Sequence, residues 1–224
     1  MDTTQHKIYI DNIIRRVENA RLKVSQHHIV KIVAISKYSD ISEIEELYKI
    51  GQRAYGENKV QDFKLKSLAL EEHPIEWHFV GNLQKNKINN LIDLNPTLFH
   101  ALDSLKLANE LQKKLLAKNK TMNVLLQINS AKEDSKSGVA PEDAQNIYKK
   151  IQQECPNIKL KGVMSIGSHS TNQLEIKKSF DLTYSIFKKL DDAQICSMGM
   201  SADFELAIEC GSNMVRLGSL MFNK

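Results

Sequence analysis

One lysine, Lys37, directly follows a short apolar run and a serine. The run at residues 30–35 (VKIVAI) predicts a buried strand, so the stem of Lys37 is expected to begin inside the protein. Burial disfavours a protonated amine, and a neutral amine can add to an aldehyde or ketone to form a Schiff base. The alternative is a lysine whose stem packs on the rim while its amine reaches water. Position alone leaves both interpretations open.

A second group of residues has the chemistry of an anion site. Gly218 and Ser219 follow a strand-like run at residues 214–217, and this run contains Arg216. Ser201 precedes a helical pattern at residues 202–210. Glycine allows close approach of backbone N–H groups, a hydroxyl donates a hydrogen bond, and arginine adds a permanent cation. Together these groups suit a phosphate at a helix N-terminus.

The same residues have a purely structural interpretation. Ser201 can be a plain N-cap of the helix that follows it. Asp203 and Glu205 put anions in the first turn of that helix, which counts against a phosphate unless they face away from it. A lysine opposite a phosphate site implies a ligand with a carbonyl group and a phosphate. Two classes fit: pyridoxal 5′-phosphate (PLP), and a phosphosugar substrate of a Schiff-base aldolase.

These residues need elements that bring them together. Short apolar runs alternate with amphipathic segments along the chain, which is typical of parallel strands connected by helices. The expected strands are residues 30–35, 53–55, 77–80, 98–101, 124–128, 160–166, 194–197 and 214–217. Eight such strands in 224 residues predict a (β/α)₈ barrel, for which about 250 residues are usual. In a barrel the carboxyl ends of the strands form the site, and Lys37, Ser201 and Gly218 all follow such ends.

The two ends of the chain are expected to complete this barrel. Residues 1–26 contain a helical pattern before the first strand, whereas little chain follows the last strand. We therefore predict a single α/β domain, residues 1–224, in which the N-terminal helix packs on the barrel where a C-terminal helix would normally lie. An open doubly wound sheet is the alternative. It would need a glycine-rich loop after the first strand, and residues 36–39 (SKYS) contain no glycine.

Composition excludes several classes of protein. The net charge is +4, and Lys and Glu are interspersed, so we expect no nucleic-acid binding. No run approaches the roughly 20 apolar residues of a membrane helix, and the first residues do not have the pattern of a signal peptide. The three cysteines lack CxxC spacing, which indicates reduced thiols in the cytoplasm. The seven histidines are scattered, so no metal site is expected.

Seven short motifs carry a resemblance to a known family. They are AISK at 34–37, YGENKVQ at 55–61, WHFVGNLQKNK at 77–87, LLQIN at 125–129, SKSG at 135–138, SMGMSAD at 197–203 and VRLG at 215–218. In this order they resemble the PLP homeostasis protein family, small PLP-binding proteins similar to the N-terminal barrel domain of bacterial alanine racemase. The resemblance runs from Ile32 to Phe222, nearly the whole chain.

The resemblance implies a role for each matched residue. Lys37 matches the lysine that holds PLP covalently as a Schiff base, and Arg216 matches the arginine that faces the pyridine nitrogen. The other cofactor-binding positions that it implies are Asn58, His78, Met200, Ser201, Gly218 and Ser219. Of these, Met200, Ser201, Gly218 and Ser219 match the phosphate-binding loops. Lys136 matches a family lysine near the mouth that takes part in PLP exchange.

One departure from the family pattern bears on exchange. The family usually has Thr-Lys-Pro after the Schiff-base lysine, whereas this chain has Tyr38-Ser39-Asp40. The resemblance therefore implies no second lysine at this point. Tyr38 could act as a local acid–base group, but a rim tyrosine packing on the mouth is the favoured interpretation.

The resemblance implies a non-enzymatic protein that acts in cytoplasmic PLP homeostasis and delivery, with PLP-dependent apoenzymes as partners. The alternative is a PLP-dependent amino-acid racemase, and a phosphosugar aldolase is a remote third. Racemases of this type carry a second domain that supplies a catalytic tyrosine across a dimer interface, and 224 residues leave no room for it. Inversion needs a second acid–base group opposite the lysine. We therefore expect a monomer with no catalytic residue of its own.

Overall fold

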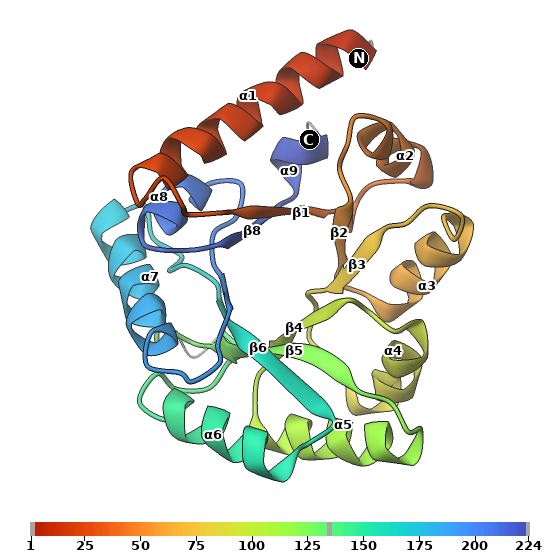
Figure 1. Ribbon diagram of the computed structural model, residues 1–224, viewed down its shortest axis with the longest axis vertical. Helices are drawn as coiled ribbons and strands as arrows, with labels where there is room; N and C mark the ends of the chain where they lie inside the picture. The colour runs from red at the N-terminus through yellow and green to blue at the C-terminus, as the bar shows by residue number, and fades with distance from the viewer. Residues whose placement is uncertain (1–2, 134–135, 223–224) are drawn as a thin grey trace.

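The computed structural model describes residues 3–133 and 136–222 and contains, in these ranges, a closed barrel of eight parallel strands (Figure 1). The strands are β1 Lys31–Ile35, β2 Ala54–Glu57, β3 Glu76–Phe79, β4 Leu98–Leu102, β5 Met122–Ile128, β6 Ile158–Ser165, β7 Ile195–Ser197 and β8 Met214–Leu217. Each strand pairs with the next in chain order, and β8 pairs with β1 to close the barrel. The predicted (β/α)₈ barrel is confirmed.

Helices surround the barrel on its outer side (Figure 1). They are α1 Thr3–Leu22, α2 Ile41–Lys49, α3 Val60–Ala69, the 3₁₀ turn η1 Lys85–Lys87, α4 Ile88–Leu94, α5 Leu105–Ala117, α6 Ala144–Glu154, α7 Gln173–Phe187, α8 Phe204–Glu209 and α9 Ser219–Phe222. The β1–α2 connection shows how the sequence sets these boundaries. The Asp40 carboxylate accepts the Glu43 N–H, and the Glu43 carboxylate accepts the Asp40 N–H. This capping box starts α2 at Ile41, four residues after Lys37.

Glycine in β2 lets the barrel interior pack closely. Ile35, Gly56, His78 and Leu98 lie in register on four successive strands, so their side chains share one face of the sheet. A Cβ atom on Gly56 would lie only 2.6 Å from the Ile35 side chain. The Ile35 side chain therefore occupies the space that a side chain at residue 56 would need.

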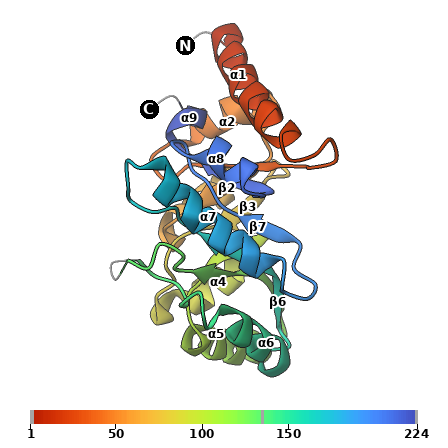
Figure 2. The ribbon, with the colours of Figure 1, turned by 90° about the vertical axis from the view of Figure 1, so that its left-hand side faces the viewer.

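The N-terminal helix packs against α8, near the short α9 (Figures 1 and 2). Ile10, Ile13 and Val17 on its inner face are buried. Two ion pairs join this segment to α8: Arg16 of α1 with Glu205 at 2.7 Å, and Lys23, just after α1, with Glu209 at 2.7 Å. After the last strand, residues 219–222 form one helical turn.

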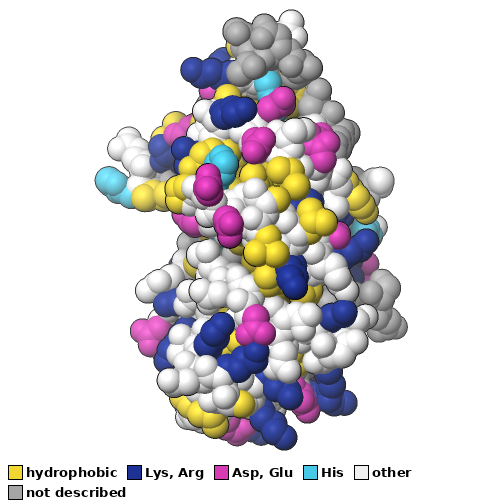
Figure 3. Space-filling view, turned by 90° about the vertical axis from the view of Figure 1, so that its right-hand side faces the viewer, with side chains coloured by type: hydrophobic (Ala, Val, Ile, Leu, Met, Phe, Trp, Pro, Cys, Tyr) yellow, Lys and Arg dark blue, Asp and Glu magenta, His cyan; other side chains and the backbone are white. Residues whose placement is uncertain are grey.

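The surface shows charges of both signs. Lys, Arg, Asp and Glu side chains occur together over the face made by α2, α3 and α4 (Figure 3). Among the described helices, none is both long and apolar enough to cross a membrane. Across the same ranges, no three His, Cys, Asp or Glu side chains are grouped so that they could hold a metal ion.

Candidate functional site

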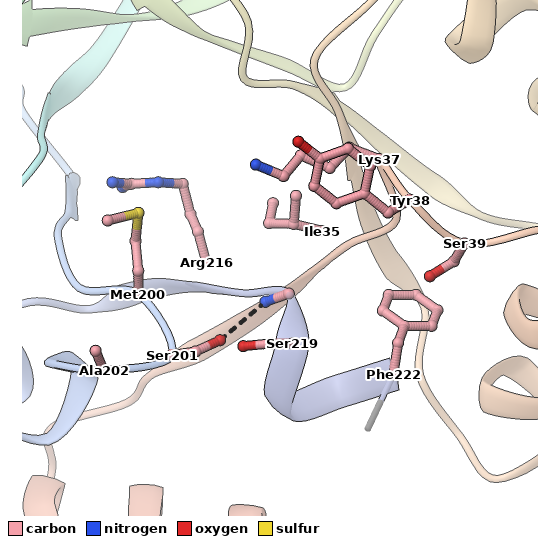
Figure 4. Close-up of a pocket in the computed structure, with 11 residues that line it drawn as sticks. Ile35, Lys37, Tyr38, Ser39, Met200, Ser201, Ala202, Arg216, Ser219 and Phe222 are labelled. Atoms are coloured by element: carbon pink, nitrogen blue, oxygen red, sulfur yellow. Dashed lines mark hydrogen bonds between the residues drawn. The ribbon is translucent and has the colours of Figure 1, made fainter. Parts of the chain in front are cut away.

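A cavity of about 420 Å³ opens at the carboxyl ends of β1 and β8, next to the loop that follows β7 (Figure 4). Its lining residues are Ile35, Lys37, Tyr38, Ser39, Met200, Ser201, Ala202, Arg216, Gly218, Ser219 and Phe222. Its volume is in the range of small-molecule sites. Residues more than 160 positions apart in the chain therefore share one cavity, because β1 and β8 are neighbours in the barrel.

Lys37 reaches this cavity from its solvent side. β1 ends at Ile35, and Lys37 is exposed, which differs from the burial expected from its apolar context. The Lys37 Nζ atom lies 4.8 Å from the centre of the Tyr38 ring, and the Tyr38 side chain is itself 78% exposed. Tyr38 is thus a rim residue beside the amine. The amine is directly accessible to a ligand that enters the cavity.

Ser201 contacts backbone N–H groups of the β8–α9 segment, rather than capping the helix that follows it. Helix α8 begins at Phe204, so its N-cap position is Asp203. The Ser201 hydroxyl accepts hydrogen bonds from the N–H group of Gly218 at 3.2 Å (the dashed line in Figure 4) and from that of Leu220 at 3.4 Å. Gly218 lies between β8 and α9, and Leu220 lies in the single turn of α9. The structure brings a hydroxyl and the backbone donors of this turn to one wall of the cavity.

The two carboxylates near α8 have separate structural partners. Asp203 accepts the Met200 N–H at 2.6 Å, and burial raises the pKa of this carboxyl. Glu205 faces outward and pairs with Arg16. Glu205 therefore does not oppose an anion in the cavity. Because the Met200 N–H is already used, Met200 lines the cavity without offering that donor.

Arg216 projects from β8 into the barrel and is held there by three hydrogen bonds. Its Nη1 atom donates to the Ser197 carbonyl at 2.9 Å and to the Ser197 hydroxyl at 2.7 Å, and its Nη2 atom donates to the Ser165 carbonyl at 2.9 Å. Burial lowers the Arg216 pKa to about 10. The guanidinium therefore remains charged at neutral pH, in a fixed orientation on the wall opposite Lys37.

A hydrogen-bonded chain continues from Arg216 through the barrel interior. The Ser197 hydroxyl lies 3.4 Å from His100 Nδ1, and His100 Nε2 lies 2.9 Å from His78 Nδ1. Arginine only donates, so the Ser197 oxygen accepts from it and directs its own hydrogen to His100. This assigns the Nε2–H tautomer to both histidines. Burial lowers the His78 pKa to about 4 and the His100 pKa well below its ordinary value, so both rings are neutral.

Three residues of the sequence analysis lie away from the cavity. His78 is buried in the barrel beneath Arg216 rather than at the cavity wall. Asn58 lines a separate polar hollow beside β2 and β3. Lys136 donates to Glu133 at 2.9 Å and to the Gly167 carbonyl at 2.7 Å, which holds two loops together. Ser135, the first residue of the SKSG motif, lies outside the described residues.

A buried polar cluster behind the β1–α2 turn was missed by the sequence analysis. Lys66 of α3 and Glu57 of β2 form an ion pair at 2.7 Å, and both side chains are almost completely buried. The pair contacts Ser36, the residue before Lys37. A signal for it exists in the helical spacing: Val60, Phe63 and Lys66 are the buried residues of α3, so the lysine occupies an inward position.

Comparisons with known proteins agree with this geometry. Residues 8–223 match the family "Alanine racemase, N-terminal domain". A pyridoxal phosphate homeostasis protein of Helicobacter pylori is 51% identical over 215 residues, covering 96% of this chain and 97% of that protein. The structure of PipY from Synechococcus elongatus with PLP bound aligns with a TM-score of 0.79 at 26% identity, covering 92% of this chain and 99% of PipY. Alanine racemase from Clostridium difficile shares the fold at 15% identity, with a TM-score of 0.71, over 94% of this chain and 56% of the racemase.

Proposed function

Because the chain belongs to the pyridoxal phosphate homeostasis protein family, we propose that it binds PLP in the cavity between β1 and β8 and acts in PLP homeostasis and delivery. In this proposal residues 1–224 act as one PLP-binding barrel domain, with Lys37 linked to PLP as a Schiff base. The convergence of the Lys37 amine, the Arg216 guanidinium and the donors around Ser201 on one cavity carries the proposal.

The donor set fits the three polar parts of PLP. An amine suits an aldehyde, a fixed cation suits a pyridine nitrogen, and backbone N–H groups with hydroxyls suit a phosphate. Lys37, Arg216 and the Ser201–Gly218–Ser219 group offer these functions on different walls of the cavity. When bound, PLP supplies a reactive aldehyde and an aromatic ring that can withdraw electrons.

Each residue has a role that its chemistry defines. Lys37 holds the cofactor at its aldehyde carbon. Arg216 donates to the pyridine nitrogen and, being a charged donor, keeps that nitrogen unprotonated. Ser201 and Ser219 bind the phosphate through their hydroxyls, the Gly218 N–H holds the Ser201 hydroxyl in place, and Met200 packs beside it. Asn58 contributes to the site from the loop after β2. His78 contributes through the hydrogen-bonded chain that links it to Arg216 by way of His100 and Ser197.

A carrier role is favoured over an amino-acid racemase by the acid–base groups at the cavity. Racemisation needs proton donors and acceptors on both faces of the substrate. Among the described lining residues, Lys37 and its neighbour Tyr38 are the groups with such chemistry, apart from the guanidinium of Arg216. The Tyr38 ring lies beside the Lys37 amine. We therefore propose a cytoplasmic monomer that passes PLP to apoenzymes and does not itself catalyse robust turnover.

The test compares the wild-type protein with Lys37→Ala and Lys64→Ala, the latter an exposed lysine on α3. Each protein is mixed with PLP, the visible absorption is recorded, and the complex is reduced with borohydride for mass spectrometry. Wild type and Lys64→Ala should be yellow and gain one PLP, at Lys37. A wild-type protein that stays colourless and takes up no PLP would refute the proposal. D-isomers formed from L-alanine at a sustained rate would instead favour the racemase.

A further inference from the structure

The residue immediately before Lys37 is held by an unusual set of buried contacts. Ser36 is fully buried at the end of β1, and its N–H donates to the Gly56 carbonyl at 3.0 Å. Its carbonyl oxygen accepts from the Lys66 ammonium at 2.7 Å and from the Ser39 N–H at 2.8 Å. All hydrogen-bonding groups of Ser36, including its hydroxyl, therefore have partners.

Those contacts control the direction in which Lys37 leaves the strand. A peptide group is planar, so the Ser36 carbonyl and the Lys37 N–H and Cα move as one unit. Two hydrogen bonds on that carbonyl thus fix the plane from which the Lys37 side chain departs. One of them comes from a charged donor, which makes it the stronger kind of hydrogen bond.

Glu57 links the same contacts into one cluster. Its Oε1 atom accepts from both Lys66 at 2.7 Å and the Ser36 hydroxyl at 2.7 Å. Its Oε2 atom is buried and has no hydrogen-bond partner among the described residues. A buried ion pair with an unpaired oxygen contributes little to stability compared with an apolar pair of the same size. Its position behind Lys37 therefore points to a function other than stability.

We infer that Glu57 and Lys66 are positioning residues for Lys37: their buried ion pair holds the Ser36–Lys37 peptide so that the amine faces the cavity at the angle that covalent PLP uptake needs. This inference rests on the proposed function. In uptake, the Lys37 nitrogen forms a double bond to the aldehyde carbon, and the aldehyde oxygen leaves as water with the two hydrogens of the neutral amine. A correctly oriented nucleophile accelerates such a step by orders of magnitude.

The decisive variant is the double substitution Glu57→Gln and Lys66→Met, which removes both charges and nearly preserves the volume. Lys64→Met on the exposed side of α3 is the matched control. Two ligands separate positioning from general structure. PLP reports the covalent step through its visible absorption, whereas pyridoxine 5′-phosphate has the ring and phosphate but no aldehyde, so it reports the cavity alone.

The double variant should take up PLP about tenfold more slowly than wild type, because its Lys37 amine is no longer held in the orientation that reaction with the aldehyde needs. Its affinity for pyridoxine 5′-phosphate should stay within about twofold, and its melting temperature within about 5 °C. Uptake of PLP at the wild-type rate would overturn the inference, as would an equal loss for both ligands in a folded protein. If wild type itself binds no PLP covalently, the proposed function fails rather than this inference.

A single substitution gives the same test if the double variant does not fold. Ser36→Ala removes only the hydroxyl that joins Ser36 to Glu57. It should slow PLP uptake about fivefold, the factor that corresponds to roughly 1 kcal/mol for one hydrogen bond, and leave pyridoxine 5′-phosphate binding unchanged. An unchanged rate in a folded Ser36→Ala protein would overturn the inference as well.

Discussion

His78 should make the barrel sensitive to mild acid. Its side chain is 2% exposed and lies between His100 and the rim residue Glu76, whose carboxylate is 4.0 Å away. Burial lowers the His78 pKa from 6.5 to about 4, so the folded protein resists protonation that the unfolded chain accepts. Above pH 6.5 both states are neutral at this residue and stability is unaffected. As pH falls below 6.5, the unfolded state binds a proton first and the folded state loses stability.

The size of this effect follows from the shift. At about 1.4 kcal/mol for each pKa unit, His78 alone costs about 3 kcal/mol once pH is below 4, and about 2 kcal/mol of this is lost between pH 7 and pH 5. His100 has a pKa lowered in the same direction and adds to the loss. This loss of stability between pH 7 and pH 5 occurs above the pH at which most carboxylates titrate.

The assay is urea unfolding followed by circular dichroism at pH 7 and pH 5. His78→Asn keeps an acceptor near the Nδ1 position and removes the titrating group, and His27→Asn changes an exposed histidine as the control. The acid-induced loss should be about 2 kcal/mol smaller in His78→Asn than in wild type or His27→Asn. Equal losses in all three proteins would refute the assignment of His78 as a buried neutral ring.

Two pairs of substitutions test the packing of the barrel and its N-terminal helix. Gly162 has φ +142° and a Cβ there would lie 1.9 Å from a carbonyl oxygen of β7, so Gly162→Ala should lower the free energy of unfolding by about 3 kcal/mol or more. Gly51 has φ +110° but open space around it, so Gly51→Ala should cost only about 1–2 kcal/mol in the same urea titration, and an equal cost would count against the steric argument. Ile13→Ala should cost about 2–4 kcal/mol because Ile13 is buried on the inner face of α1, whereas Ile14→Ala, at a residue 45% exposed, should cost less than about 0.5 kcal/mol. Similar melting temperatures for these two variants would contradict the packing of α1.

The barrel could be predicted because its signal is local. Short apolar runs and intervening helical patterns each reflect burial of a few consecutive residues, and the capping box at Asp40 also lies within four residues. The exposure of Lys37 could not be predicted in this way. Its apolar neighbours indicated burial, but β1 ends two residues earlier at the open mouth of the barrel.

The parts of the site that were missed depend on register and on distant partners. Ser201 allowed two local interpretations, yet its hydroxyl accepts from backbone groups 17 and 19 residues away. The pairing of His78 with His100 requires β3 and β4 to align in one register, which strand patterns alone do not define. The burial of Lys66 depends on the packing of α3 against β2, where its partner Glu57 lies.

Closure of the barrel by β1 and β8 has a consequence for the order of folding. These strands pair residues 31–34 with residues 214–217, so the ladder joins segments made early and late in synthesis. Contacts of such high sequence separation form slowly, and until they form β1 and β8 are open sheet edges. The cavity lies across this seam, between Lys37 after β1 and Gly218 after β8. The nascent chain therefore acquires this cavity only when the barrel closes, and any ligand that spans the seam would stabilise that last step by mass action.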